Sequence, residues 1–285
     1  METLIDLPQR ASGYIGDILR VADQKRNDIV SVIVFGSALQ GPFSALSDVD
    51  LIVVLADGVP RRFRKQMDDE LAVLELSHGL RASPKSKLEI FYTMIDKRAG
   101  LFLSHFVCYK NDLLSGNPAK VFHINPVAES FLLSARIGFG NIVLSAKTVW
   151  GEDLLDRVRI PPITRWHLLM NCLALLLFNA FALLTLPFLP NATKYSMLAL
   201  KWSLHNCYFC INQRVATIEQ EVDFFNKNLS EPWVLTKLLS LRRHYRRSLR
   251  FVRKSFRAIL QMFMLAARHN QFPIAVVRKE ERLND

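Results

Sequence analysis

Two aspartates, Asp48 and Asp50, stand at alternate positions where an apolar run, 51–55, begins. The run is typical of a buried strand, and aspartate is depleted in strands and rarely buried without a partner. Because successive strand side chains point to opposite faces, the two carboxylates share one face and lie close together. Two negative charges so close resist joint ionisation unless a cation lies between them. Mg²⁺ combines one or two protein carboxylates with water and substrate phosphates, so the pair predicts a Mg²⁺ site.

Glu89 supplies a third acid, within a short apolar stretch, 87–94, that predicts another strand. If this strand lies beside that of Asp48 and Asp50, the three carboxylates form one cluster. Such a cluster can hold two metal ions, which stabilise the attacking and leaving oxygens in phosphoryl or nucleotidyl transfer. The alternative is an acid at an exposed sheet edge, or one paired with Lys87.

Gly36 and Ser37 form a turn directly after the preceding predicted strand. Glycine lets the backbone approach a phosphate closely, and backbone N–H groups at the start of a helix bind anions. The Ser37 hydroxyl would add a hydrogen bond to a terminal phosphate. The pair therefore predicts a phosphate-binding turn, and an ordinary turn is the alternative.

The order Phe-Gly-Ser, ten residues, Asp-Val-Asp-Leu and then a strand acid resembles the signature of the DNA polymerase β-type nucleotidyltransferase superfamily. The resemblance extends over roughly 29–94. It implies that Gly36 and Ser37 bind the triphosphate and that Asp48 and Asp50 hold Mg²⁺. It also implies that Glu89 is the third metal ligand or the base for the incoming hydroxyl.

The second half of the chain resembles bacterial antibiotic nucleotidyltransferases of the streptomycin/spectinomycin adenylyltransferase type, in which a helical domain closes over the nucleotide. This likeness is architectural. It implies a helical domain that contributes to nucleotide binding and selects the acceptor.

These residues need a sheet to position them, and the first part of the chain alternates helix with strand, whereas the pattern from about 126 is wholly helical. We therefore predict an α+β fold: a small mixed-sheet nucleotidyltransferase domain, 1–125, followed by an all-α helical-bundle domain, 126–285. The expected elements of the first part are helices at 9–26 and 61–80 and strands at 29–35, 48–55 and 87–94. In the second part, helices are expected at 126–150, 163–184, 192–210, from 217 and at 230–263.

Charge is unevenly distributed along the chain: residues 1–150 contain 17 Lys or Arg against 16 Asp or Glu, and 151–285 contain 20 against 10. A basic half of this kind favours a polyanionic partner such as nucleic acid, a nucleotide or an anionic membrane. Four cysteines are too few for a disulfide framework, and the N-terminus lacks the features of a signal peptide. We therefore expect a cytoplasmic protein.

One stretch, Trp166 to Ala192, carries no formal charge and is long enough to span a bilayer. Because His167, Asn171 and Asn179 interrupt it, a buried core helix is the favoured interpretation. Membrane association is the alternative.

Lys201 lies within an otherwise apolar predicted helix, so it either extends to the surface or reaches an anion. By resemblance to helical domains of the superfamily, it would contact the triphosphate.

The last predicted helix combines an apolar stripe with many cations. One interpretation is a track for the phosphates of RNA. The alternatives are a solvated basic face and a surface for anionic membrane. The candidate polyanion-binding residues are Arg243, Arg246, Arg247, Arg250 and Lys254.

The sequence as a whole predicts a nucleotidyltransferase that moves a nucleoside monophosphate from an NTP, with ATP as the expected donor, to an acceptor hydroxyl and releases pyrophosphate. Two Mg²⁺ ions, or Mn²⁺ in their place, would assist. RNA, such as a transfer RNA 3′ end modified by a toxin-like enzyme, is the favoured acceptor. Aminoglycosides are polycations and suit a basic domain less well. An antibiotic adenylyltransferase, a cyclic-oligonucleotide synthase and a non-catalytic RNA-binding module remain alternatives, and an antitoxin partner stays open.

Overall fold

The computed structural model of the 285-residue chain describes residues 9–36, 39, 49–80, 104–124, 135–269 and 273. The chain forms two compact units. The first contains residues 1–125 and 145–160, and the second contains residues 126–144 and 161–285.

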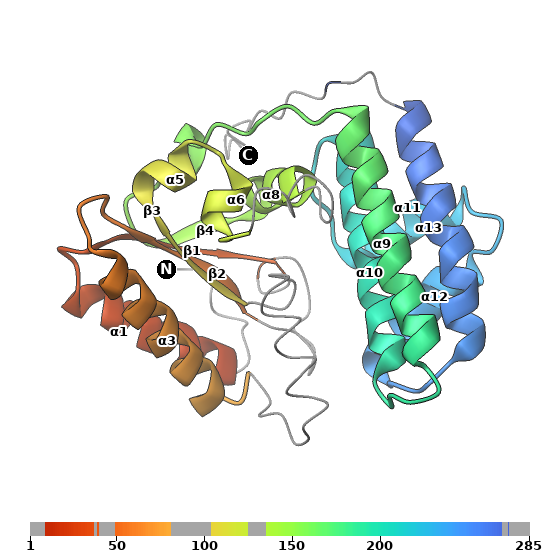
Figure 1. Cartoon of the computed structure of the whole chain (residues 1–285), viewed down its shortest axis with the longest axis horizontal. Helices are drawn as coiled ribbons and strands as arrows, with labels where there is room; N and C mark the ends of the chain where they lie inside the picture. Colours follow the sequence, from red (N-terminus) through yellow and green to blue (C-terminus); the bar gives the residue numbers. More distant parts are fainter. Residues whose placement is uncertain are drawn as a thin grey trace, which may run out of the picture. The chain divides into compact units, whose positions relative to one another are not determined.

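A mixed four-stranded sheet organises the first unit (Figure 1). The strand order is β3-β2-β1-β4, in which β1 is antiparallel to both of its neighbours and β2 is parallel to β3. The strands are β1 (Ile29–Phe35), β2 (Asp50–Leu55), β3 (His105–Tyr109) and β4 (Lys147–Gly151).

Two long helices, α1 (Gln9–Gln24) and α3 (Arg61–Ser77), cover one face of this sheet (Figure 1). Leu51, Val53 and Leu55 share one side of β2 and enter a single apolar core with the helices. Ile52 and Val54, on the other side of β2, are buried as well, so both faces of this strand are covered. Short elements complete the unit: α5 (Lys110–Leu114), α6 (Pro118–Val121) and a 3₁₀ turn, η3 (Leu155–Arg157).

Strand β4 corrects the prediction of one helix over 126–150. Helix α8 (Ala135–Ser145) ends before it, and Lys147–Gly151 pairs with β1. Thr148, Val149 and Trp150 are β-branched or aromatic, and the open edge of β1 gives them a pairing partner. Gly151 has a φ of 80°, and a Cβ atom there would clash with the Val30 carbonyl. The predicted boundary after residue 125 had assigned this strand to the helical part, whereas 145–160 lies in the first unit.

Six helices form most of the described second unit, and α9, α10 and α13 pack against one another (Figure 1). Capping boxes open α9, through Thr164 and His167, and α11, through Thr217 and Gln220. The six are α8, α9 (Arg165–Thr185), α10 (Ala192–Asn212), α11 (Ile218–Asn226), α12 (Trp233–Arg243) and α13 (Leu249–His269). Together with the mixed sheet, they confirm the α+β class.

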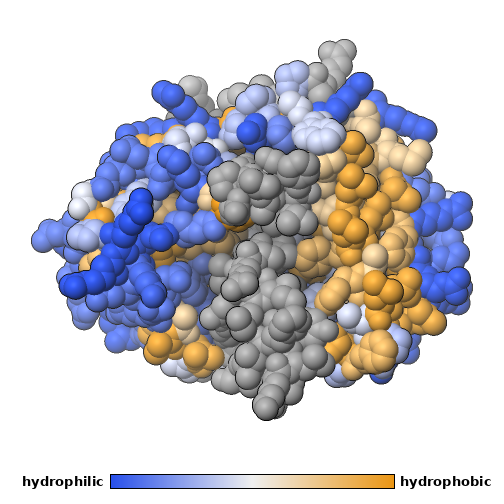
Figure 2. Space-filling model, viewed as in Figure 1, coloured by the Kyte–Doolittle hydropathy of each residue, from blue (hydrophilic) through white to orange (hydrophobic). Residues whose placement is uncertain are grey.

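Helix α9 is the one described helix long and apolar enough to cross a membrane. Its polar residues lie inside the bundle, where Asn179 Nδ2 donates to the Val252 carbonyl at 3.0 Å and Asn206 Nδ2 donates to Asn171 Oδ1 at 3.1 Å. The opposite face carries exposed leucines, among them Leu177, and apolar side chains gather there in Figure 2. Its inner face is therefore that of a bundle helix.

The single helix predicted over 230–263 is interrupted. Residues 244–248 separate α12 from α13. Tyr245 Oη donates to the Pro190 carbonyl at 2.7 Å, Arg247 donates to the Leu186 carbonyl, and the Ser248 N–H donates to Thr193 Oγ1 at 3.2 Å. These contacts with the connection between α9 and α10 outweigh the continuous helical pattern of the sequence.

Candidate active site

Gly36 and Asp50 meet at one end of the sheet. Asp50 pairs with Phe35 across β1 and β2, so the residue after Phe35 lies beside the aspartate. Gly36 has a φ of 75°, and its carbonyl accepts a hydrogen bond from the Leu39 N–H at 3.1 Å, so the chain turns directly after β1. A Cβ atom at Gly36 would clash with Asp50 Oδ2. The turn therefore favours glycine for its backbone conformation, and the absence of a Cβ atom lets the Asp50 carboxylate pack against it.

This arrangement fits a divalent cation. An acidic oxygen lies against a backbone turn that favours glycine, and carboxylate oxygen is the donor that Mg²⁺ prefers. Ser37, Asp48 and Glu89 lie outside the described residues. Within the described ranges, no three His, Cys, Asp or Glu side chains lie close enough together to hold a metal ion. The structure thus brings together Gly36 and Asp50 of the predicted site.

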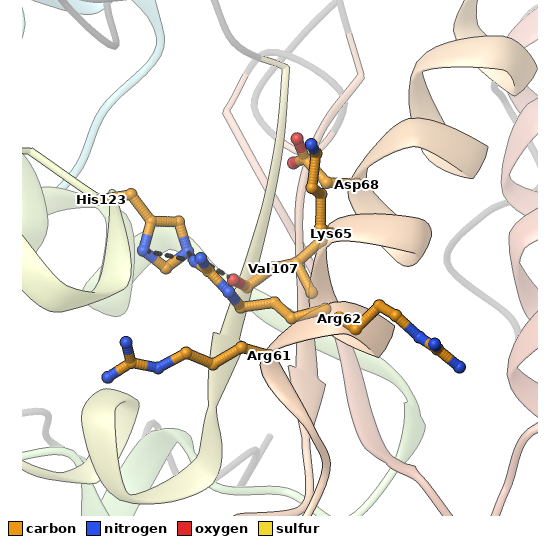
Figure 3. A pocket seen from close by; sticks show the side chains of 7 residues that line it. Arg61, Arg62, Lys65, Asp68, Val107 and His123 are labelled. Atoms are coloured by element: carbon orange, nitrogen blue, oxygen red, sulfur yellow. Dashed lines mark hydrogen bonds between the residues drawn. The ribbon is translucent and has the colours of Figure 1, made fainter.

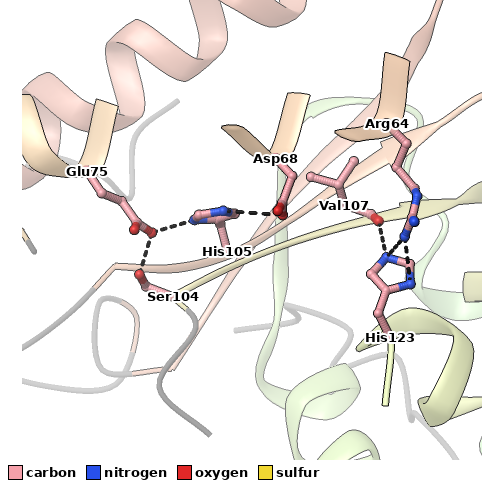
Figure 4. Close-up of polar contacts among 7 residues, drawn as sticks. All are labelled: Arg64, Asp68, Glu75, Ser104, His105, Val107 and His123. Carbon is pink, nitrogen blue, oxygen red and sulfur yellow. Dashed lines mark hydrogen bonds and ion pairs between the residues drawn. The ribbon is translucent and has the colours of Figure 1, made fainter. Parts of the chain in front are cut away.

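His105 on β3 forms a charge network with buried Glu75 and exposed Asp68 of α3 (Figure 4). His105 pairs with Leu51, the residue after Asp50, and its side chain is 2% exposed. Its Nδ1 lies 2.6 Å from Glu75 Oε1, and its Nε2 lies 3.4 Å from Asp68 Oδ1. The network therefore joins the α3 helix to strand β3.

The charge state of His105 follows from these partners. Burial lowers its pKa, but the hydrogen bonds that His105 donates to Asp68 and Glu75 outweigh burial and raise the pKa from 6.5 to about 9. His105 is therefore an imidazolium at neutral pH, held between two carboxylates. Burial, with Glu75 and Asp50 adding to it, raises the pKa of Tyr14 on α1, which keeps that phenol protonated.

Sequence reasoning missed this network, although α3 carries a signal for it. Met67, Leu71 and Glu75 recur at four-residue spacing and are all buried. An acid on the apolar stripe of a helix needs a buried partner. The sequence does not identify that partner, because His105 lies on a five-residue strand that was not predicted.

The candidate residues of the second half are spread over several elements. Lys201 is half-buried on α10, in a different unit from Asp50. Arg243 ends α12 and is exposed, and Arg246 and Arg247 lie in the segment between α12 and α13. Arg250 and Lys254 are on α13, so the five basic residues do not share one helix.

Three of these five cations make contacts within the unit. Arg247 donates to the carbonyl at the end of α9, the Arg250 guanidinium lies 4.9 Å from the Trp233 ring centroid, and Lys254 Nζ lies 2.7 Å from Glu231 Oε1. These contacts give the three side chains structural roles in the helical unit.

Comparison with known families and structures agrees with the geometry. Residues 16–97 match the family model of the nucleotidyltransferase domain, which confirms the resemblance drawn from the spacing of Gly36, Ser37, Asp48 and Asp50. No curated protein matches the sequence. Among solved structures, the crystal structure of spectinomycin adenyltransferase AAD(9) from Enterococcus faecialis with ATP and spectinomycin is similar in fold. It is 9% identical, with a TM-score of 0.55 over 90% of this chain and 99% of that chain.

Proposed function

We propose that this chain, which carries a nucleotidyltransferase domain of the DNA polymerase β type, moves the nucleoside monophosphate of ATP to the hydroxyl of an RNA acceptor in the cytoplasm. The observation that carries the proposal is the contact between Gly36 and Asp50, inside the residues that match the family model. A carboxylate packed against a phosphate-binding turn suits a reaction on a triphosphate.

Each residue of the proposed site has its own role. Backbone N–H groups at Gly36 and Ser37 bind the triphosphate. Asp48, Asp50 and Glu89 would hold Mg²⁺, which when bound neutralises charge on the phosphates. The acceptor oxygen forms a bond to the α-phosphorus as the bond to the bridging oxygen breaks, and pyrophosphate leaves. Glu89 takes the proton of the acceptor hydroxyl.

RNA is the acceptor that the charge of the chain favours, because residues 151–285 carry twice as many Lys and Arg as Asp and Glu. A small hydroxylated antibiotic is the second candidate, and the likeness to the structure of AAD(9) with ATP and spectinomycin favours it. That likeness covers both units of this chain, although 9% identity supports the fold alone.

The first experiment tests transfer with Asp50→Asn. Purified protein is incubated with Mg²⁺, α-labelled ATP and total RNA, and the products are resolved on a denaturing gel. Because the variant keeps the shape of Asp50 but loses its charge, we expect transfer to fall roughly 100-fold or more. Asp69→Asn, an exposed position on α3, is the matched control and should retain wild-type transfer.

Two outcomes would redirect the assignment. Undiminished label transfer by Asp50→Asn, with an unchanged melting temperature, would contradict the catalytic role of that carboxylate. Wild-type transfer to spectinomycin or streptomycin, with no label in RNA, would establish the small-molecule acceptor instead. The other three labelled nucleotides, tried in turn, test whether ATP is the preferred donor.

A further inference from the structure

We propose that a cavity at the start of α3 binds phosphate-ester groups, at a place separate from the turn of Gly36. The cavity has a volume of about 510 Å³ (Figure 3). This volume falls within the range of small-molecule sites, roughly 300–1,000 Å³. Four cations stand against one acid in its lining, which consists of Arg61, Arg62, Arg64, Lys65, Asp68, Val107 and His123.

Stability of the helix does not account for the two cations of its first turn, Arg61 and Arg62. The N-terminal end of a helix carries a partial positive charge, so Arg or Lys in the first turn is unfavourable and an anion is favourable. Helix α3 begins at Arg61 with no acid in its first turn and no side-chain cap from Pro60. A bound anion would offset the repulsion between these cations and the helix end, because both attract the anion.

One of the four arginine and lysine side chains is held in place by the fold. His123 Nε2 lies 2.6 Å from the Val107 carbonyl, and Arg64 Nη1 lies 2.7 Å from His123 Nδ1 and also contacts Nε2 (Figure 4). Burial lowers the pKa of His123, with Arg64 acting in the same direction. The neutral ring therefore donates from Nε2 to the carbonyl and accepts from the guanidinium at Nδ1.

His123 adopts a left-handed backbone conformation, with a φ of 53°. Such a conformation is uncommon for a residue with a side chain and is retained where the surroundings fix it. It directs the ring to Arg64, so the guanidinium is ordered before any ligand arrives. An ordered guanidinium loses less side-chain entropy when it binds a phosphate.

The chemistry of the lining selects phosphate among anions. Arginine presents parallel N–H donors that match two phosphate oxygens, and three arginines with a lysine can neutralise more than one phosphate charge. Val107 pairs with Val53, three residues along β2 from Asp50, which is about 10 Å of strand. The phosphates come either from an RNA backbone or from a free nucleotide or pyrophosphate, and the two sources are separable by experiment.

The test is direct binding, with EDTA present so that Mg²⁺-dependent transfer does not occur. Two probes are used: a fluorescent single-stranded RNA of about ten nucleotides, followed by anisotropy, and pyrophosphate, followed by calorimetry. The test variant is Arg61→Gln/Arg62→Gln/Lys65→Gln, which leaves the ordered Arg64 in place. The matched control, Arg165→Gln/Lys227→Gln/Arg268→Gln, removes the same charge from exposed residues of the second unit that lie outside the candidate polyanion-binding set.

We expect the cavity variant to lose roughly 10-fold or more in affinity and to lower the salt dependence of RNA binding by about two phosphate contacts. The control should lose about 3-fold or less. Loss of both probes, or of one, supports the site and identifies the source of the phosphate. No binding of either probe to wild type, an unchanged affinity in the cavity variant, or a larger loss in the control would overturn it.

A second measurement guards against a folding defect. Pyrophosphate at about 100 times its wild-type Kd should raise the melting temperature of the cavity variant by about half as much as that of wild type, or less. The binding test contains EDTA and does not depend on transfer, so its result is informative whether or not the proposed transfer reaction is found.

Discussion

The first turns of α3 and the junction between α12 and α13 both concentrate arginine and lysine, and the two regions differ in what surrounds those cations. At the junction, Arg247, Arg250 and Lys254 contact a carbonyl, an indole ring and a carboxylate of their own unit. At the start of α3, the cations line a cavity. The difference supports the binding site that we propose at the start of α3, where Arg64 contacts His123 and Arg61, Arg62 and Lys65 line the cavity.

Helix ends give the same contrast. Arg242 and Arg243 occupy the last turn of α12, where cations are favoured by the partial negative charge of the helix end. Arg61 and Arg62 occupy the first turn of α3, where cations are disfavoured. Charge composition alone pointed to the second half of the chain, because it counts cations without their position on a helix.

The largest effect on stability is expected for the pair of His105 and Glu75, which holds the C-terminal part of α3. If α3 tolerates the cations at its start because Glu75 and His105 hold its other end, His105→Gln should lower the free energy of unfolding by about 3 kcal/mol. The substitution removes the positive charge and leaves Glu75, which is 2% exposed, with a buried negative charge. Urea unfolding of both proteins measures the difference, with exposed His244→Gln as the control.

The same network predicts how stability depends on pH. The pKa of His105 is raised in the folded state from 6.5 to about 9, so its stabilisation is fully present below pH 6.5 and is lost as the pH rises through about 9. The urea midpoint of wild type should therefore fall across this window more than that of His105→Gln. Parallel curves for the two proteins would contradict a charged His105.

The contrast between these regions also marks the limits of sequence reasoning. Strand β1 and the placement of Gly36 and Asp50 in one site could be predicted from the sequence, because a strand, a glycine turn and an alternating acid pattern are local signals. The cavity was not, because His123 and Val107 reach α3 only through the tertiary fold. Roles for Ser37, Asp48 and Glu89 stay predictions.

Two segments were predicted wrongly for the same reason: their partners are distant in the sequence. Residues 147–151 continue a helical pattern in the sequence, but β1 offers them a pairing partner. Residues 244–248 would extend a helix, but their hydrogen bonds to the connection between α9 and α10 are available only in the assembled bundle. In both segments tertiary partners outweigh local preference.

A smaller effect is expected for adjacent arginines at the α12–α13 junction. Arg247→Gln removes the hydrogen bond to the Leu186 carbonyl and should lower the free energy of unfolding by about 1 kcal/mol. Arg246→Gln removes the same charge from an exposed neighbour and should change it by less than about 0.5 kcal/mol. Urea unfolding compares the two variants. Equal effects of the two substitutions would show that Arg247 contributes to stability through its charge and not through its hydrogen bond to Leu186. The contacts at the junction would then not distinguish its arginines from those of α3.

The smallest effects should have opposite signs at the two helix ends. Arg62→Gln removes a cation from the first turn of α3 and should raise the free energy of unfolding by roughly 0.5 kcal/mol, because the helix end repels that charge. Arg243→Gln removes one from the last turn of α12 and should lower the free energy by a similar amount, roughly 0.5 kcal/mol. Arginine and glutamine have nearly equal helix propensities, so propensity cancels in both variants. Urea midpoints at low salt measure the pair, and both differences should shrink in high salt, since exposed charges are screened. A loss of stability in both variants would mean that the cations of α3 also serve the fold, and it would remove the distinction on which the phosphate site at its start depends.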